Sequence, residues 1–129
     1  MFFQINPSNG VPVYEQVYRQ VAFAVANGSL RSGELIPSVR QLAKDLAINP
    51  NTVARAYRQL QDQQIIDPIR GTGMAIASGA KSICKTERGR ILRLRMRQVI
   101  DEARQSHLDN SEIEKLFFTE LNKKRGGQA

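Results

Sequence analysis

The stretch GELIPSVRQLAKDLAINPNTVARAYR, residues 33–58, decides the fold that this sequence predicts. Ser38 stands before apolar residues at helical spacing. Gln41 follows Ser38 at the spacing of a capping box, in which each side chain satisfies a free N–H of the other residue. We therefore expect a helix over residues 39–47.

A second helix should follow almost at once. Asn49 is among the best N-cap residues and Pro50 suits a first helical position, which predicts a helix over residues 50–63. So short a break between two helices forces their axes to cross sharply. This geometry is that of a helix-turn-helix.

One more helix should precede this pair. Pro12 can open it and Gly28 suits its left-handed end, which predicts a helix over residues 12–27. Its apolar face repeats every four residues, at Val13, Val17, Val21 and Val25. We expect residues 30–37 to be a connector between this helix and the next.

The sequence period changes after the helix-turn-helix. Two β-prone runs, residues 65–69 and 74–77, flank the turn Arg70-Gly71-Thr72-Gly73, which predicts a hairpin. Pro68 lacks a backbone donor, so its strand should lie at an edge. A hairpin directly after a helix-turn-helix is a wing. Residues 1–78 should therefore form a winged helix-turn-helix DNA-binding domain.

The remaining residues, 79–129, should form a helical tail. Small and polar residues predict a linker over residues 78–85, and a long helix should then run over residues 86–106. Asp109 and Glu112 have capping-box spacing and should begin a last helix. The predicted fold class is mainly α with a small β-hairpin, with a C-terminal two-helix dimerisation tail.

The apolar stripes of the two tail helices are too large for these helices to bury by themselves. A second copy of the chain would cover the remainder in a self-complementary interface. The alternative is a monomer whose tail folds back on its own DNA-binding domain. The predicted dimer-interface residues are Leu92, Met96, Val99, Ile100, Ala103, Ile113, Leu116, Phe117, Phe118 and Leu121.

Composition narrows the class of protein. The 129 residues carry 19 Lys and Arg against 12 Asp and Glu, and the net charge of +7 favours nucleic acid or an anionic membrane surface as a partner. The one cysteine, Cys84, leaves no disulfide and no cysteine cluster for zinc. No run approaches the ~18 apolar residues of a membrane span, and no signal-peptide pattern opens the chain. We expect a cytoplasmic protein that is not an enzyme and uses no metal or cofactor.

Polar side chains gather at the start of the second helix of the helix-turn-helix, where a recognition helix meets base edges. Asn51 can form two hydrogen bonds to adenine, and arginine can do so to guanine. Arg55 and Arg58 are three residues apart and share a helix face. A capped surface helix with solvated charges is the alternative. The predicted DNA-binding residues are Ser38, Arg40, Asn49, Asn51, Thr52, Arg55, Arg58, Arg70, Gly71, Thr72 and Gly73.

Three basic regions allow two interpretations each. Arg40 faces the phosphate backbone, or it pairs with Asp45 or Asp62. The wing tip, residues 70–73, approaches a DNA strand closely, or it is an ordinary hairpin turn. The run of arginines over residues 90–97 makes auxiliary phosphate contacts, or it is a solvated face.

An ordered set of motifs carries a resemblance to a known family: residues 33–43, Leu46, residues 49–57 and residues 71–73. Over about residues 10–77 the sequence resembles the GntR family of bacterial repressors. The variant NPNTVARAY at residues 49–57 is similar to the YtrA-like and MocR-like branches. MocR-like proteins carry a long aminotransferase-like domain, whereas the tail here resembles the YtrA type. That resemblance implies homodimerisation and often control of transporter operons.

The sequence departs from other branches of the GntR family at two positions. Those branches usually have arginine near Pro50 and Ala54, so the base contacts of these arginines cannot be carried over. Base reading then falls to Asn51, Thr52 and Arg55.

We expect a sequence-specific transcriptional regulator, a repressor acting as a homodimer on an inverted-repeat operator. The alternative is a sequence-independent, nucleoid-type nucleic-acid-binding protein. Two helices cannot enclose a ligand pocket within one chain. The operator and any small-molecule effector therefore stay open at this point.

Overall fold

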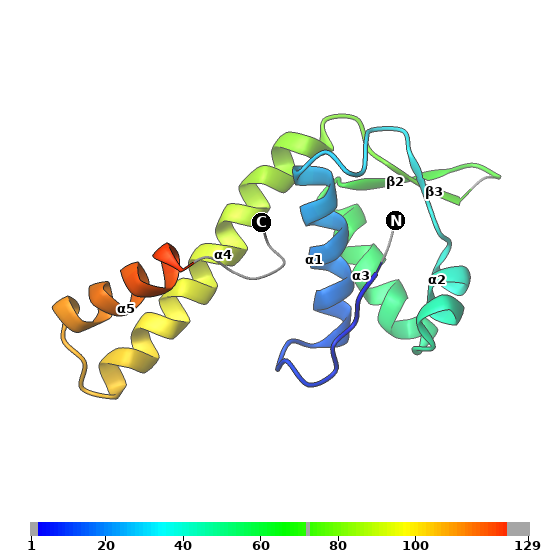
Figure 1. Cartoon of the computed structure of the whole chain (residues 1–129). Coiled ribbons are helices and arrows are strands. Elements are labelled where there is room, and N and C mark those ends of the chain that lie inside the picture. Colours follow the sequence, from blue (N-terminus) through cyan, green and yellow to red (C-terminus); the bar gives the residue numbers. More distant parts are fainter. Residues whose placement is uncertain (1–2, 72, 124–129) are drawn as a thin grey trace. The chain divides into compact units, whose positions relative to one another are not determined.

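The computed structural model describes residues 3–71 and 73–123. Within these residues, five helices and three strands follow one another in the order α1, β1, α2, α3, β2, β3, α4, α5 (Figure 1). The chain divides into two compact units, Met1–Arg90 and Ile91–Ala129. The predicted fold class, mainly α with a small β element, is confirmed.

Three helices of the first unit form the predicted helix-turn-helix arrangement. Their bounds are Val13–Ala26 for α1, Val39–Leu46 for α2 and Pro50–Asp62 for α3. The Ser38 hydroxyl accepts a hydrogen bond from the Gln41 N–H (3.1 Å) and so caps α2. The Gln41 side chain donates to the Asp45 carboxylate (2.7 Å) instead of completing a capping box. Ala47 takes a left-handed conformation (φ 54°) that ends α2 and turns the chain towards α3.

The wing belongs to a three-stranded antiparallel sheet with the order β1, β3, β2. The bounds are Leu35–Ile36 for β1, Ile66–Ile69 for β2 and Gly73–Ile76 for β3. The expectation of a connector over residues 30–37 is therefore wrong in part, because Leu35 pairs with Ala75 of β3. A strand of two residues has no alternating pattern, so only its distant partner reveals it. Pro68 does lie in an edge strand, as predicted.

The core of the first unit lies where α3 packs against α1, α2 and β2. Its fully or almost fully buried side chains include Val17, Val21, Val25, Val53 and Leu60. The Tyr57 hydroxyl donates a hydrogen bond to the Pro37 carbonyl (2.6 Å). This bond links α3 to the segment just before α2. The two helices of the helix-turn-helix are therefore joined by this bond as well as by the short turn between them.

An extended N-terminal segment lies along α1, and sequence patterning did not predict it. The Gln16 side chain accepts from the Asn6 N–H and donates to the Asn6 carbonyl, both at 2.8 Å. Gln20, one turn further on, pairs in the same way with the backbone of Gln4. A side-chain amide offers one donor and one acceptor group, as a backbone amide does. The two glutamines therefore satisfy the backbone groups of Gln4 and Asn6 in the way that the backbone of a neighbouring strand would.

The helix α4 spans Ala80–Gln105 and begins earlier than the sequence predicted. The predicted linker over residues 78–85 is wrong for most of its length. Ala80 and Cys84 are fully buried, and Glu87 is 8% exposed. These positions are spaced i, i+4 and i+7 and form one buried helix face. The face carries an alanine, a cysteine and a glutamate, so a pattern of large apolar residues could not reveal it.

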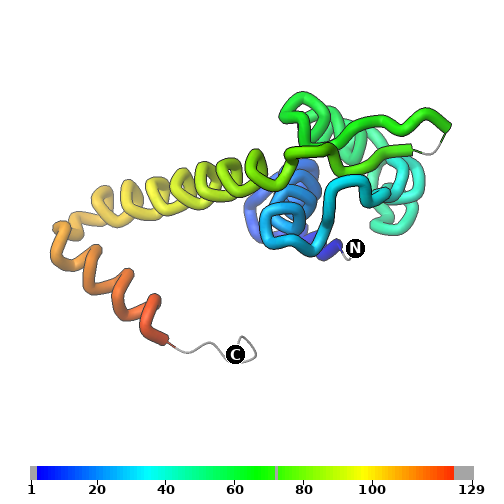
Figure 2. Tube along the Cα trace, turned by 90° about the horizontal axis from the view of Figure 1, so that it is seen from above, coloured from blue at the N-terminus to red at the C-terminus, as the bar shows by residue number. Residues whose placement is uncertain are grey.

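The second unit comprises the rest of α4 and the helix α5, Asn110–Asn122. Figure 2 shows α4 as one continuous helix. Asp109 accepts from the Glu112 N–H (2.9 Å), and Glu112 accepts from the Asp109 N–H (3.2 Å), which confirms the predicted capping box. Among the described residues, no helix has the length and apolarity to cross a membrane. The same residues contain no group of three or more metal-binding side chains suited to an ion.

Candidate nucleic-acid interface

The start of α3 carries the polar side chains that the sequence predicted to contact DNA bases. Asn51 is exposed and Thr52 is half-buried. The next residue, Val53, is fully buried in the core and anchors this turn of the helix. The Asn49 side-chain oxygen accepts from the Asn51 N–H (2.8 Å) and caps α3. Asn49 therefore has a structural role at this position. The exposed side chain of Asn51 and the half-buried side chain of Thr52 are the polar groups that this turn offers to a ligand.

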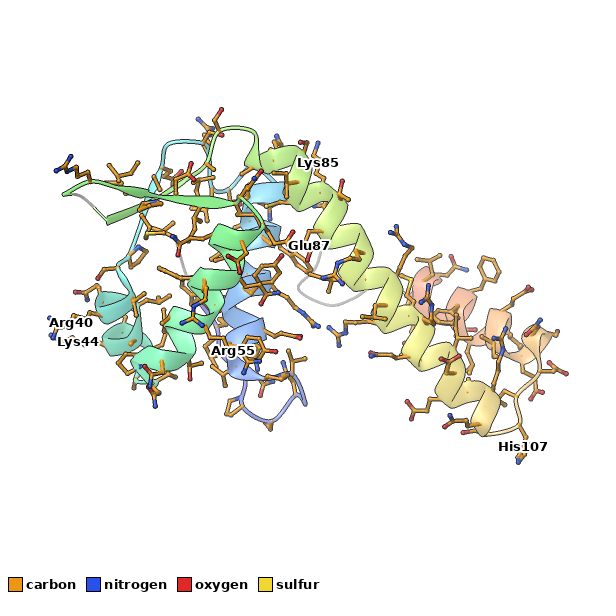
Figure 3. All side chains as sticks on the ribbon, turned by 180° about the vertical axis from the view of Figure 1, so that it is seen from behind. Arg40, Lys44, Arg55, Lys85, Glu87 and His107 are labelled. Carbon is orange, nitrogen blue, oxygen red and sulfur yellow. The ribbon has the colours of Figure 1, made fainter. Side chains whose placement is uncertain are left out.

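Two cationic side chains stand on α2 beside this turn. Arg40 is exposed, and no carboxylate of the described residues lies within 4.0 Å of its guanidinium. The proposed pairing with Asp45 or Asp62 is therefore not seen. Lys44 follows Arg40 by one helical turn, and Figure 3 shows the two side chains close together. Sequence reasoning missed Lys44, although its i, i+4 spacing from Arg40 was a usable signal.

An open depression of about 450 Å³ joins the start of α2 to the start of α3. Its lining residues are Ser38, Arg40, Gln41, Ala43, Lys44, Ile48 and Pro50. None of them is acidic, and two are cations, so the depression attracts anions such as phosphate groups. The two helix starts add the partial positive charge of their free N–H groups.

Arg55 lies on α3 (Figure 3) and does not line the depression. Its guanidinium carbon stands 3.7 Å from the centre of the Tyr14 ring on α1. This is cation–π geometry, and it restricts the directions in which an otherwise exposed arginine can point. Sequence reasoning named Arg55 but missed Tyr14, because the two positions are 41 residues apart. Arg58 is exposed one turn further along α3.

The wing tip is exposed at the described positions Arg70, Gly71 and Gly73, and Thr72 lies outside the described residues. Gly71 has φ 78° and Gly73 has φ 114°, backbone conformations that favour glycine. The glycines therefore shape the turn. Such a turn is needed both if the tip approaches a DNA strand and if it is an ordinary hairpin turn.

The arginine run of α4 divides into two kinds of side chain. Arg90 donates from Nε and Nη2 to the two carboxylate oxygens of Glu87, at 2.9 and 2.6 Å. Arg90 is therefore held in an ion pair with Glu87 within the first unit, although its side chain is still 54% exposed. Arg93, Arg95 and Arg97 are exposed.

The second unit leaves most of its large apolar side chains in solvent. Of the predicted interface residues, Ile113 is buried at 7% exposure, and Ile100 and Ala103 are half-buried. The others are between 39% and 77% exposed, the extremes being Phe117 and Leu121. Leu94 is 42% exposed and belongs to the same set, although the helical stripe in the sequence did not include it.

The chain is similar to bacterial transcription regulators in both sequence and structure. Residues 13–76 match the family model of bacterial regulatory proteins, gntR family. The HTH-type transcriptional repressor YtrA of Bacillus subtilis is 35% identical over 113 residues, which cover 88% of this chain and 85% of that protein. The chain belongs to the GntR family.

Solved structures of GntR proteins have the same fold over most of this chain. A GntR family transcriptional regulator from Listeria monocytogenes is 26% identical with a TM-score of 0.72, over 87% of this chain and 97% of that one. YtrA from Sulfolobus acidocaldarius, a GntR-family transcription factor, is 27% identical with a TM-score of 0.57, over 94% and 100%. The protein is accordingly a DNA-binding transcription regulator of the YtrA-like type, and this family of regulators is not one of enzymes.

Proposed function

We propose that this protein is a homodimeric, sequence-specific repressor that binds an inverted-repeat operator in the bacterial cytoplasm. The observation that carries the proposal is the division of surface between the two units. The first unit buries most of its large apolar side chains and exposes cations around its helix-turn-helix, whereas the second exposes most of its large apolar side chains.

The first unit supplies the DNA contacts. The start of α3 enters the major groove, where Asn51 and Thr52 meet base edges. Arg40 and Lys44 on α2 neutralise backbone phosphates at the depression beside α3. The wing tip at Arg70 and Gly71 approaches the neighbouring backbone. Phosphate contacts fix the position of the protein on the duplex, and base contacts then select the sequence.

The second unit supplies the dimer contacts. Met96, Val99, Leu116 and Phe118 are each more than half exposed, and together with their apolar neighbours they favour a protein partner over water. A second copy offers the same side chains, so the interface is two-fold symmetric. A two-fold protein binds a two-fold site. We expect half-sites one helical turn apart, or a multiple of it, in opposite orientation.

Repression follows from occupancy of such an operator. The relative from Bacillus subtilis is named a transcriptional repressor, and the resemblance to the YtrA type implies control of transporter operons. We propose the same type of target here.

The test selects bound duplexes from a random library with the purified protein and then measures their affinity. Asn51→Ala should weaken binding to the selected operator by about 1–3 kcal/mol, because it removes a base contact without disturbing the core. The control is Gln61→Ala, an exposed position near the other end of α3. Equal affinities for all three proteins would refute the assignment of α3 as the recognition helix.

A sequence-independent nucleoid-type protein is the alternative function, and the exposed cations are the observation that favours it. The same selection separates the two. A specific regulator prefers its operator to random duplex by roughly 10³-fold or more. Selected duplexes that share no motif would establish the alternative.

A further inference from the structure

Hydrogen bonds link three polar side chains where the first part of α4 meets α1; two of them are buried, and the third, Arg90, is 54% exposed. Tyr18 of α1 is 1% exposed and Glu87 of α4 is 8% exposed. The Tyr18 hydroxyl donates to Glu87 Oε1 at 2.8 Å. Arg90, one turn after Glu87, donates to both oxygens of the same carboxylate. We call Tyr18, Glu87 and Arg90 the α1–α4 joint.

This joint is not part of the surfaces described so far. None of its three residues lies at the start of α2 or α3, in the wing, or among the exposed apolar side chains of the second unit. A buried charged group is a poor way to stabilise the packing of two helices, because removing it from water costs free energy. Apolar side chains of similar volume would stabilise the packing as well or better. A polar joint is different in one respect. Its hydrogen bonds are directional, so they fix how one helix is rotated and tilted on the other.

The joint lies at the base of the part of α4 that belongs to the second unit, so a change in the direction of α4 there would displace the far end of the helix. Arg90 is the last residue of the first unit, and α4 continues from there as one helix to Gln105. At 1.5 Å per residue, the part of α4 beyond Arg90 is roughly 22 Å long. A change of about 10° at its base would move its end by about 4 Å. That is about the rise of one base pair along a DNA strand, 3.4 Å.

We propose that Glu87, held by Tyr18 and Arg90, is a positioning residue that fixes the direction in which α4 leaves the DNA-binding unit. It thereby sets the half-site spacing that the dimer accepts. The inference rests on the proposed dimeric, operator-binding function and adds to it a determinant of operator geometry. Glu87 touches no DNA and acts only through α4. The lowered pKa of the Glu87 carboxyl agrees with this role, because hydrogen bonds from Arg90 and Tyr18 keep it ionised against the effect of burial.

The experiment uses the full chain and a library of duplexes with two copies of the selected half-site and every spacer length over one helical turn. Wild-type protein should enrich one spacer length by at least tenfold over its neighbours. Glu87→Gln keeps the shape of the side chain but loses the ion pair. We expect it to bind single half-sites as wild type does, while its enrichment of the preferred spacer falls to about twofold.

Two further variants provide a second test and a control. Tyr18→Phe keeps the buried ring and removes only its hydrogen bond, so it should broaden spacer choice in the same direction if Glu87→Gln folds poorly. Lys85→Gln removes a charge from an exposed position of the same helix and should keep the wild-type spacer preference. A merely stabilising joint would weaken binding to every spacer by the same factor.

Unchanged spacer selectivity in both Glu87→Gln and Tyr18→Phe would overturn the inference, as would equal weakening at all spacers. Failure of the underlying function looks different. In that case the wild-type protein itself selects no half-site or shows no spacer preference.

Discussion

The two units of this chain use their apolar residues in opposite ways. In the first unit, the large side chains of α1 and α3 close a core, with Leu60 at 0% exposure. In the second unit, Leu121 is 77% exposed and Ile113 is the one predicted interface residue that is buried, among those described. A surface that is already polar and cationic suits a nucleic acid. A surface that is still apolar suits another protein surface, and on this difference rests the proposal that the first unit binds DNA and the second binds a second copy of the chain.

The largest expected effect comes from placing the same substitution in both units. Leu60→Ala leaves a cavity in a closed core and should lower the free energy of unfolding by about 2–5 kcal/mol. Leu121→Ala removes the same atoms from a solvent-exposed position, so the folded single chain loses little. Chemical denaturation of both variants at low protein concentration measures the contrast. Equal losses would mean that the two units do not differ as described.

A charge placed on the apolar face of the second unit should break the dimer. Met96→Glu would bury a carboxylate in each half of a symmetric interface, and we expect dimer dissociation to become about 100-fold easier, or about 2.7 kcal/mol. Gln98→Glu is the matched control, because it adds the same charge at an exposed polar position of α4. Sedimentation equilibrium compares the two. An effect of Gln98→Glu as large as that of Met96→Glu would point to general repulsion instead of an interface.

The cations of α2 should control the response of DNA binding to salt. Each neutralised phosphate contributes about 0.9 to the slope of log K against log salt, so Arg40→Ala should lower the slope of a dimer by about 2. Arg31→Ala, an exposed arginine outside the depression, serves as the control. If both variants keep the wild-type slope, Arg40 does not contact phosphate in the complex.

The smallest expected effect concerns the ring beneath Arg55. Tyr14→Leu should weaken operator binding by about 0.5–1 kcal/mol, because the guanidinium loses the surface that restricts its direction. Tyr14→Phe retains the aromatic face and should bind as wild type does. Fluorescence anisotropy resolves this difference. A Tyr14→Phe variant as weak as Tyr14→Leu would show that the hydroxyl, not the ring, matters.

Sequence patterns predicted what depends on neighbours along the chain. The caps at Ser38 and Asp109 and the edge strand at Pro68 were all predictable, because each follows from residues within one turn or one strand. Distant contacts were not. Strand β1 depends on its pairing of Leu35 with Ala75, and the start of α4 depends on the burial of Ala80, a small residue with no apolar signal of its own.

The candidate interface shows the same division. Arg40 and Asn51 could be named from their places in two predicted helices. The stacking of Arg55 on Tyr14 required the packing of α1 against α3, which no local pattern contains. The pairing of Arg90 with Glu87 has the i, i+3 spacing of neighbours on a helix, but the burial of Glu87 could not be predicted while residues 78–85 were expected to be a linker and the helix to start only at residue 86.

The most direct test of the account is the mass of the full-length protein in solution and on DNA, measured by sedimentation at micromolar concentration. The account predicts a dimer before DNA is added and two chains on each selected operator duplex afterwards. A monomer that still binds its operator tightly as a single chain would contradict the assignment of the exposed apolar face of α4 and α5 to a second copy.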